Sequence, residues 1–332
     1  MMRHLQLTAL RPTRRGSLRP LGAAVVLLFA AVRLGAQGSA PDRRLGLITH
    51  DLDARSISLL RAANVRHVKT TLYWKLWQSD PAYPARFAAG IQQLAAAGFE
   101  ITVVVHEPPV GSSYATRVQV YRDYAAFVGD RARQFPQVTN WQLWNEQDAG
   151  WTDVFGWHAV SFTEQGRNYA AMLQLATPRI RQANPRARVV VGGLAGDSLV
   201  PFVNGIYAGQ GPFDVMAVHA YGIPIAIAAR GRGTLVRTAM RAHGDARPMW
   251  LTEFGVDSAN LRAAYRMTAP GRWDAEQQKE WADLATGNDA TGLYARMIGY
   301  VLFDHTNYGF GIVRADGAST RPAYAWLQQR NR

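Results

Sequence analysis

Two short stretches, WQLWNEQD at residues 141–148 and PMWLTEFGVD at residues 248–257, each place one glutamate at the polar end of an apolar run. The apolar residues before Glu146 and Glu253 are typical of a strand that is buried on both faces. Desolvating a carboxylate at the end of such a strand costs free energy. Its presence there indicates that the protein uses it. Both stretches therefore predict working carboxylates at the ends of buried strands.

Around these stretches the chain alternates between short apolar runs and longer helical patterns, and no low-complexity linker interrupts them. The expected strands are 45–49, 65–72, 99–106, 139–144, 187–194, 213–219, 248–252 and 297–303. The expected helices include 53–63, 84–97, 118–135, 163–183, 235–243 and 276–284. Eight strand-then-helix units predict an α/β fold, a single parallel (β/α)₈ TIM barrel. A doubly wound open sheet is the alternative, but Gly46-Leu47-Ile48-Thr49 lacks the glycine fingerprint that such a sheet would carry after its first strand.

A barrel of this kind places its working residues at the carboxyl ends of the strands. Those ends carry polar or aromatic residues almost throughout: His50, Asp51, 69–74, His106, Glu107, Asn145, Glu146, Asp197, His219, Tyr221, Glu253, Asp304 and His305. Together they predict a polar cleft. Two carboxylates brought to one cleft by different strands are the minimum equipment for cleaving a glycosidic bond with retention.

The motifs WNE (144–146) and TEFG (252–255) resemble those of retaining glycoside hydrolases of clan A. The stretches FDVMAVHAYG (213–222) and FGIVRADGASTRPAYAWL (310–327) also resemble that group. The nearest resemblance is to single-domain members of family 39, followed by the cellulase-like family 5, and it covers residues 45–328.

This resemblance implies a role for each matching residue. Glu146 matches the general acid/base and Glu253 the nucleophile, with a separation of about 5–5.5 Å between their carboxyl groups. Asn145 matches a residue that hydrogen-bonds the sugar 2-hydroxyl, and Tyr221 matches an aromatic residue that orients the nucleophile. The H-x-Y spacing of His219 and Tyr221 places both side chains on one face of their strand. His219 and His106 match histidines that contact the sugar.

The chain departs from the family pattern on two strands. The second strand offers Lys69 where an arginine is frequent near the nucleophile, and a lysine is a point charge rather than a planar fork. The eighth strand lacks a tryptophan platform under the sugar, which leaves Tyr300 or Phe303 for that role. Trp74 and Trp151 lie in expected loops and are candidates for stacking on a sugar. These departures concern the shape of the sugar site more than the reaction.

Other interpretations of the two glutamates stay open at this stage. Glu146 could cap a following helix, and Glu253 could form a structural ion pair with Lys69. A non-catalytic glycan-binding protein or a transglycosylase on the same barrel would carry the same residues. Metal-dependent hydrolysis would need an H-x-H pair on the first strand, where Thr49-His50-Asp51 stands instead, so neither a metal nor another cofactor is expected.

The N-terminal residues 1–36 have the pattern of an export signal. A basic segment without acids precedes the apolar run Leu21–Val32, which is followed by the small residues Gly35 and Ala36. Twelve helical residues rise about 18 Å, less than the ~30 Å hydrocarbon core of a bilayer, so a membrane span is the weaker interpretation. Residues 13–19 (TRRGSLR) resemble a twin-arginine motif, with Ser17 where an aromatic is usual. We therefore expect export to the periplasm or the medium, with 37–332 as the catalytic domain; Arg33 leaves an uncleaved anchor as the alternative.

Composition limits the remaining classes of function. The chain has no cysteine, which excludes a disulfide framework and a thiolate nucleophile. The net charge of +13 includes six arginines within residues 1–36, and the rest keeps 31 basic against 24 acidic residues. Those arginines are scattered and not interleaved with aromatics, so a solvated basic surface is favoured over a nucleic-acid site. The expected partner is a carbohydrate.

Overall fold

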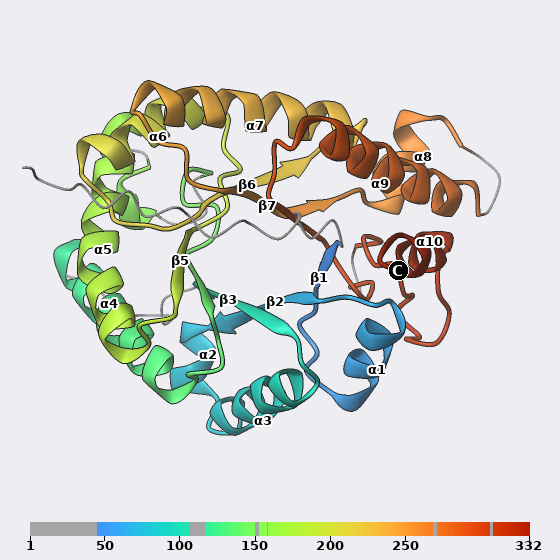
Figure 1. The fold of residues 1–332 in the computed structure, drawn as a ribbon, viewed down its shortest axis with the longest axis horizontal. Coiled ribbons are helices and arrows are strands. Elements are labelled where there is room, and N and C mark those ends of the chain that lie inside the picture. The colour runs from blue at the N-terminus through green and yellow to red at the C-terminus, as the bar shows by residue number, and fades with distance from the viewer. Residues whose placement is uncertain (1–44, 107–116, 150–152, 158, 268–270, 306–307) are drawn as a thin grey trace, which may run out of the picture. The chain divides into compact units, whose positions relative to one another are not determined.

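The computed structural model contains eight parallel strands surrounded by helices, which confirms the predicted (β/α)₈ barrel (Figure 1). It describes residues 45–106, 117–149, 153–157, 159–267, 271–305 and 308–332. All of these residues belong to one unit that runs from Pro41 to Arg332. The predicted export signal, 1–36, lies outside the described residues. No helix in the described part of the chain is both long and apolar enough to cross a membrane.

The strands occupy the predicted places in the sequence. They are β1 (Gly46–Ile48), β2 (His67–Tyr73), β3 (Glu100–His106), β4 (Asn140–Leu143), β5 (Arg188–Val191), β6 (Met216–Tyr221), β7 (Met249–Gly255) and β8 (Arg296–Gly299). The helices are α1 (Ala54–Ala62), α2 (Trp74–Ser79), α3 (Tyr83–Ala96), α4 (Arg117–Gln134), α5 (Phe162–Ala183), α6 (Leu199–Ala208), α7 (Ile225–Ala242), α8 (Ser258–Ala264), α9 (Arg272–Thr291) and α10 (Pro322–Arg330). A 3₁₀ turn, η1, spans Asp153–Phe155.

The sheet runs in the order β5-β4-β3-β2-β1-β8-β7-β6, and every pairing is parallel. Two isolated parallel bridges, Val190 with Val215 and Leu194 with Val218, join the β5 segment to β6. These bridges close the ring, so the carboxyl ends of all eight strands meet on one rim.

The two faces of each strand have different surroundings. On β3, Ile101, Val103 and Val105 belong to the large hydrophobic cluster that packs the strands against the helices. Glu100 and Thr102 alternate with them, because successive side chains of a strand point to opposite faces. A separate small cluster, Val190, Val215, Ala217 and Trp250, fills part of the opposite face.

A charged cluster lies at the amino-terminal ends of the strands. Arg296 approaches Glu100 with two nitrogens, at 2.8 and 3.0 Å, and Arg188 donates to the same carboxylate at 2.6 Å. His67 Nδ1 lies 3.1 Å from Glu100 Oε2. The guanidinium groups of Arg188 and Arg296 also lie over the Trp250 ring, 5.1 and 4.0 Å from its centroid. This network holds the starts of five strands together.

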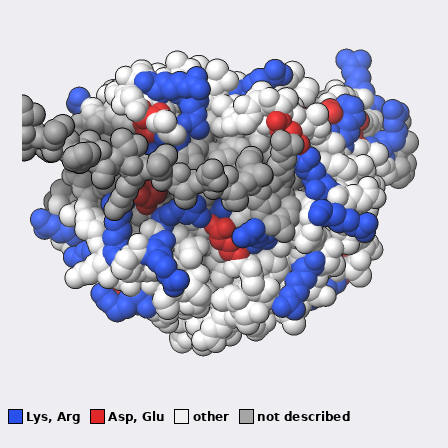
Figure 2. All heavy atoms as spheres, viewed as in Figure 1, with Lys and Arg blue, Asp and Glu red and all other residues white. Residues whose placement is uncertain are grey.

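Basic side chains are distributed over the molecular surface. On the face shown in Figure 2, Lys and Arg side chains are spread widely, with uncharged surface between them. They do not merge into one continuous patch on the described part of that face.

Candidate active site

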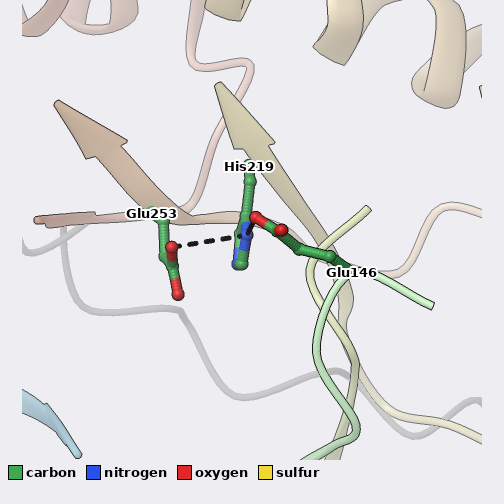
Figure 3. A group of neighbouring side chains, drawn as sticks. All are labelled: Glu146, His219 and Glu253. Atoms are coloured by element: carbon green, nitrogen blue, oxygen red, sulfur yellow. Dashed lines mark hydrogen bonds and ion pairs between the residues drawn. The ribbon is translucent and has the colours of Figure 1, made fainter. Parts of the chain in front are cut away.

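The two predicted carboxylates meet at the rim of the barrel, with His219 of β6 between them (Figure 3). His219 Nδ1 lies 2.8 Å from Glu146 Oε1 and 3.5 Å from Glu253 Oε2. One carboxylate oxygen of each glutamate and one ring nitrogen of His219 all lie within 4.8 Å of one another. Residues 107 positions apart in the sequence are therefore brought into a single site.

A β-bulge aims Glu253 into this site. Met249, Leu251 and Phe254 pack in the outer hydrophobic cluster, whereas Trp250 belongs to the inner one. The register of β7 against β8 shifts between Leu251 and Phe254. Leu251 pairs with Met297 and Phe254 with Gly299, so β7 has one more residue than β8 over this interval. Such an extra residue changes the direction of the side chains that follow it. Without the shift, strict alternation would direct Glu253 outward with Leu251.

Both oxygens of the Glu253 carboxylate accept hydrogen bonds. Lys69 Nζ of β2 donates to Oε1 at 2.8 Å, and the Tyr221 hydroxyl of β6 donates to Oε2 at 2.5 Å. Burial alone would raise the pKa of Glu253, but the nearby His219, the Lys69 ammonium and these hydrogen bonds hold it well below its usual range. The arrangement keeps this carboxylate ionised.

Tyr221 and His219 both approach Glu253, so they share one face of β6 as the H-x-Y spacing predicts. Desolvation of the Tyr221 hydroxyl and the neighbouring Glu253 carboxylate raise the pKa of this hydroxyl, so it remains a proton donor to that carboxylate at neutral pH.

Glu146 stands on a backbone with an unusual conformation. Its φ angle is 49° and that of Trp144 is 70°, both in the left-handed region that residues other than glycine rarely occupy. Such conformations cost about 1–3 kcal/mol each and persist only where surrounding contacts hold them.

The two residues after Glu146 supply those contacts. The Gln147 side chain donates to the Gly192 carbonyl at 2.8 Å. The buried Asp148 carboxylate accepts the backbone N–H groups of Ala195 and Gly196 at 2.9 and 3.0 Å. Burial raises the pKa of Asp148 to about 6 against the lowering effect of these two hydrogen bonds. The segment carrying Glu146 is thus tied to the loop between β5 and α6.

Glycines allow that loop to approach so closely. A Cβ atom on Gly192 would lie 2.4 Å from Gln147 Oε1, and one on Gly196 would lie 2.2 Å from the Asp148 carbonyl oxygen. A Cβ atom on Gly193 would lie 1.9 Å from His219 Nε2. The loop therefore supports Glu146 and His219 from one side. Its glycines are required because a side chain would collide with these neighbours, and not because of their φ angles.

Three further predicted residues on the rim are Asn145, His106 and Tyr300. Asn145 Oδ1 is buried and has no hydrogen-bond partner among the described residues. His106 ends β3 and its ring lies 5.4 Å from that of Tyr73. Tyr300, which follows β8, contacts the rings of Tyr221 and Phe310 at 6.2 and 5.5 Å. Tyr300 is therefore placed beside the tyrosine that holds Glu253.

The expectation for Trp74 needs correction. It does not lie in a loop but opens α2, with 2% of its surface exposed. Its ring stacks on Phe127 at 5.6 Å and meets Tyr124 edge-on at 5.9 Å. A ring covered in this way has no face left for a sugar, because α2 places it against α4. Trp151 lies outside the described residues.

His50, two residues after β1, belongs to the predicted ring of polar strand ends, but the sequence assigned it no individual role. Burial lowers the pKa of its imidazole, while the neighbouring Glu253 carboxylate acts in the opposite direction. Its ring contacts Tyr300 at 6.2 Å and His305 at 6.1 Å.

The spacing of Glu146, His219 and Glu253 would suit a metal ion by distance alone. The Lys69 ammonium already contacts the Glu253 carboxylate, so a cation there would meet a like charge. This donor set fits an acid, a base and a nucleophile better than it fits a cation site.

A (β/α)₈ barrel with two glutamates at the ends of β4 and β7 is the arrangement that the sequence resemblance to clan A glycoside hydrolases implies. The family model described as "Cellulase (glycosyl hydrolase family 5)" matches residues 46–304. The chain belongs to glycosyl hydrolase family 5, which the sequence resemblance ranked second, after family 39.

Solved structures support the fold. The chain is similar to the β-glycosidase BGL167, at 13% identity and a TM-score of 0.65, over 88% of this chain and 97% of that one. It is also similar to GH5_18 from Streptomyces cattleya, solved with GlcNAc, at 18% identity and a TM-score of 0.64, over 88% and 80%. The family 1 β-glucosidase from Thermotoga maritima matches at 12% identity and a TM-score of 0.60, over 83% and 85%. No curated protein matches the chain.

Proposed function

We propose that this protein is an exported retaining β-glycosidase that acts on a poly- or oligosaccharide, with Glu253 as nucleophile and Glu146 as general acid/base. The observation that carries the proposal is the shared site of the two carboxylates. One oxygen of each carboxylate lies within 4.8 Å of one oxygen of the other, which suits a double displacement because no water has to fit between the two groups.

The two carboxylates have different surroundings, as their two roles require. Lys69 and Tyr221 stabilise the ionised form of Glu253, which is the form that attacks. In the first step a Glu253 oxygen bonds to the anomeric carbon, the bond from that carbon to the leaving oxygen breaks, and Glu146 gives its proton to that oxygen. In the second step Glu146 takes a proton from water, the water oxygen bonds to the anomeric carbon, and the Glu253 carboxylate leaves.

His219 supports this division of labour. Its Nδ1 approaches both carboxylates, and its buried ring fixes the distance between them. Asn145 is adjacent to Glu146, and its buried amide oxygen accepts no hydrogen bond from the described residues. This supports a role in accepting a hydrogen bond from a sugar hydroxyl.

The decisive experiment traps the covalent intermediate. A fluorinated aryl β-glycoside should add one glycosyl mass to the protein, and peptide mapping should place it on Glu253. Glu253→Gln and Glu146→Gln should each lower kcat by at least about 10³-fold, with unchanged circular dichroism. Full activity in both variants would overturn the assignment.

The same measurements separate the two neighbouring functions. Sugar binding without any adduct would indicate a non-catalytic glycan-binding protein. An adduct that is released faster by an added sugar acceptor than by water would indicate a transglycosylase. Mass spectrometry of the protein recovered outside the cell, and in a strain without twin-arginine transport, tests export and its route.

A further inference from the structure

Two tyrosines of neighbouring helices, Tyr124 on α4 and Tyr169 on α5, reach the carboxyl end of β4, just before the segment that carries Glu146. The two helices pack against each other on the outside of the barrel (Figure 1). Both tyrosines are fully buried. A buried tyrosine hydroxyl needs a hydrogen-bond partner, and both hydroxyls find theirs in the backbone around the end of β4.

The Tyr169 hydroxyl stands between β4 and β5. It donates to the Leu143 carbonyl at 2.6 Å and accepts the Gly192 backbone N–H at 2.8 Å. At the start of the same strand pair, the Arg188 N–H donates directly to the Thr139 carbonyl. Ladder bonds between parallel strands are evenly spaced, so Gly192 and Leu143, each four residues further along, mark the place of another direct bond. The hydroxyl replaces that bond and holds the two strand ends apart.

Tyr124 makes the matching connection between β4 and β3. Its hydroxyl accepts the Trp144 backbone N–H at 2.9 Å and donates to the Val105 carbonyl at 2.7 Å. Burial raises the pKa of both tyrosine hydroxyls, so each keeps the proton that it donates. The end of β4 is therefore held to β3 by Tyr124 and to β5 by Tyr169.

The backbone changes direction immediately after these hydrogen bonds. Trp144 and Glu146 have the positive φ angles that persist only where surrounding contacts hold them. Gln147 and Asp148 hold the far side of this turn, through the loop after β5. The two tyrosine hydroxyls hold its near side, so the residue between the two attachments is Glu146.

Ring packing fixes the two tyrosines themselves. The Trp144 ring meets Tyr124 edge-on at 5.2 Å and Phe155 at 5.3 Å, and Phe155 meets Tyr169 at 5.5 Å. The rings form one buried cluster below the turn. A tyrosine in such a cluster can lose its hydroxyl and keep its ring in place, so the hydroxyl and the ring can be tested separately.

Tyr169 also connects this turn with the imidazole that contacts Glu146. Gly192, whose N–H it accepts, is followed by Gly193, where a side chain would collide with His219. His219 Nδ1 in turn lies 2.8 Å from Glu146 Oε1. One hydroxyl group thus borders both the backbone before Glu146 and the loop behind His219.

We propose that Tyr124 and Tyr169 are positioning residues for the general acid/base: their hydroxyl groups hold the end of β4 so that the Glu146 carboxyl reaches the leaving oxygen. The proposal rests on the proposed glycosidase function and assigns part of its proton transfer to two side chains that do not contact the sugar. Loss of either hydroxyl should therefore impair proton donation by Glu146 more than attack by Glu253.

The test uses Tyr169→Phe and Tyr124→Phe, which each remove one oxygen and keep the ring. The substrates are a phenyl and a dinitrophenyl β-glycoside of the sugar whose fluorinated form labels Glu253. Dinitrophenolate leaves without a proton, whereas phenolate needs one from Glu146. Each variant should lower kcat/KM by about tenfold or more for the phenyl glycoside and by less than about threefold for the dinitrophenyl glycoside.

Tyr294→Phe is the matched control. It removes another buried hydroxyl, which donates to the Ala229 carbonyl of α7 at 2.7 Å. The control should lower the Tm about as much as the other two variants, but it should change kcat/KM equally for both glycosides. A merely structural role of Tyr124 and Tyr169 predicts the same equal change for them.

Hydrogen exchange followed by mass spectrometry adds a measurement that does not depend on turnover. The peptide containing Gly192 should exchange faster in Tyr169→Phe, because its N–H loses its acceptor, and should keep the wild-type rate in Tyr294→Phe. Unchanged exchange, or equal effects on the two glycosides in both tyrosine variants, would overturn the positioning role and leave a labelled Glu253 as evidence for the glycosidase. Full activity in Glu253→Gln would instead overturn the assignment on which this role rests.

Discussion

Lys69 Nζ lies 2.8 Å from Glu253 Oε1, and both side chains are buried at the centre of the site. The sequence left open that Glu253 serves only as the acidic partner of a structural ion pair with Lys69. The structure adds Tyr221 and His219 to the same carboxylate, so the pair is part of a larger site. A buried ammonium also favours the ionised carboxylate, which is the form that a nucleophile requires.

Lys69→Met should therefore raise the pKa of Glu253. Glu253 is active when ionised, so the acidic limb of the kcat/KM profile should move to higher pH, by about one unit or more. The measurement is a pH profile with an aryl glycoside between pH 3 and pH 8. Lys69→Arg keeps the charge and should leave the limb near its wild-type position; an unmoved limb in Lys69→Met would show that the ammonium does not tune Glu253.

Gly193→Ala should displace His219, which lies between the two glutamates. The new methyl group would lie 1.9 Å from His219 Nε2, and the buried imidazole has no room to retreat. Displacing His219 should lower kcat/KM by about 100-fold, because small errors in position are expensive at a reacting centre. Gly231→Ala in α7 meets nothing within 4 Å and should keep full activity with up to about 1 kcal/mol more stability. Equal activity of the two variants would contradict the role of His219.

Asp148→Asn should loosen the segment that carries Glu146. The amide would face one of the two N–H groups with its own NH₂, so one hydrogen bond is lost and Glu146 shifts. A fall in kcat of roughly tenfold or more is expected, with a smaller change in KM. Gln147→Ala, which loses the bond to Gly192, should act in the same direction. Unaltered kcat in both variants would show that this attachment does not position the acid/base.

Asp148 also predicts how stability depends on pH. Its folded pKa, about 6, lies above its ordinary value of 3.8, so the folded state binds this proton more tightly than the unfolded state. Its stabilising contribution is complete below pH 3.8 and is lost as the pH rises through 6, by about 3 kcal/mol. Urea denaturation of the wild-type protein and of Asp148→Asn between pH 4 and pH 7 checks this, since the variant lacks the effect. Parallel curves for the two proteins would refute it.

Glu100→Gln should destabilise the barrel without altering its chemistry. The substitution leaves Arg188 and Arg296 at the amino-terminal ends of the strands without their carboxylate, and breaking such a pair costs about 3 kcal/mol. Thermal unfolding should show a lower Tm, while kcat at low temperature remains near the wild-type value. A lower kcat with an unchanged Tm would mean that this cluster serves the active site instead.

Much of the architecture could be predicted because apolar runs and helical patterns are local properties. The eight strands buried on both faces stand out from the helices between them, and Glu146 and Glu253 stand out as charges at the ends of such runs. The shared face of His219 and Tyr221 follows from strand alternation, which depends only on the spacing of two residues.

Other features depend on contacts between distant segments. Nothing local distinguishes Trp74 from a loop residue, because its burial arises from packing on Phe127 and Tyr124 of α4. A cavity between the end of β1 and α3, lined by His50 and Gln93 among others, likewise exists only once both elements are in place.

The sequence by itself determined that this chain forms a barrel and that two glutamates lie at its rim. Only the tertiary structure decided that Glu253 faces inward, because the register shift between Leu251 and Phe254 arises from the pairing of β7 with its neighbours. Strand alternation depends on one chain segment alone, whereas this bulge depends on how β7 pairs with both β6 and β8. The local pattern therefore places the nucleophile on the correct strand, and the sheet as a whole turns it toward His219.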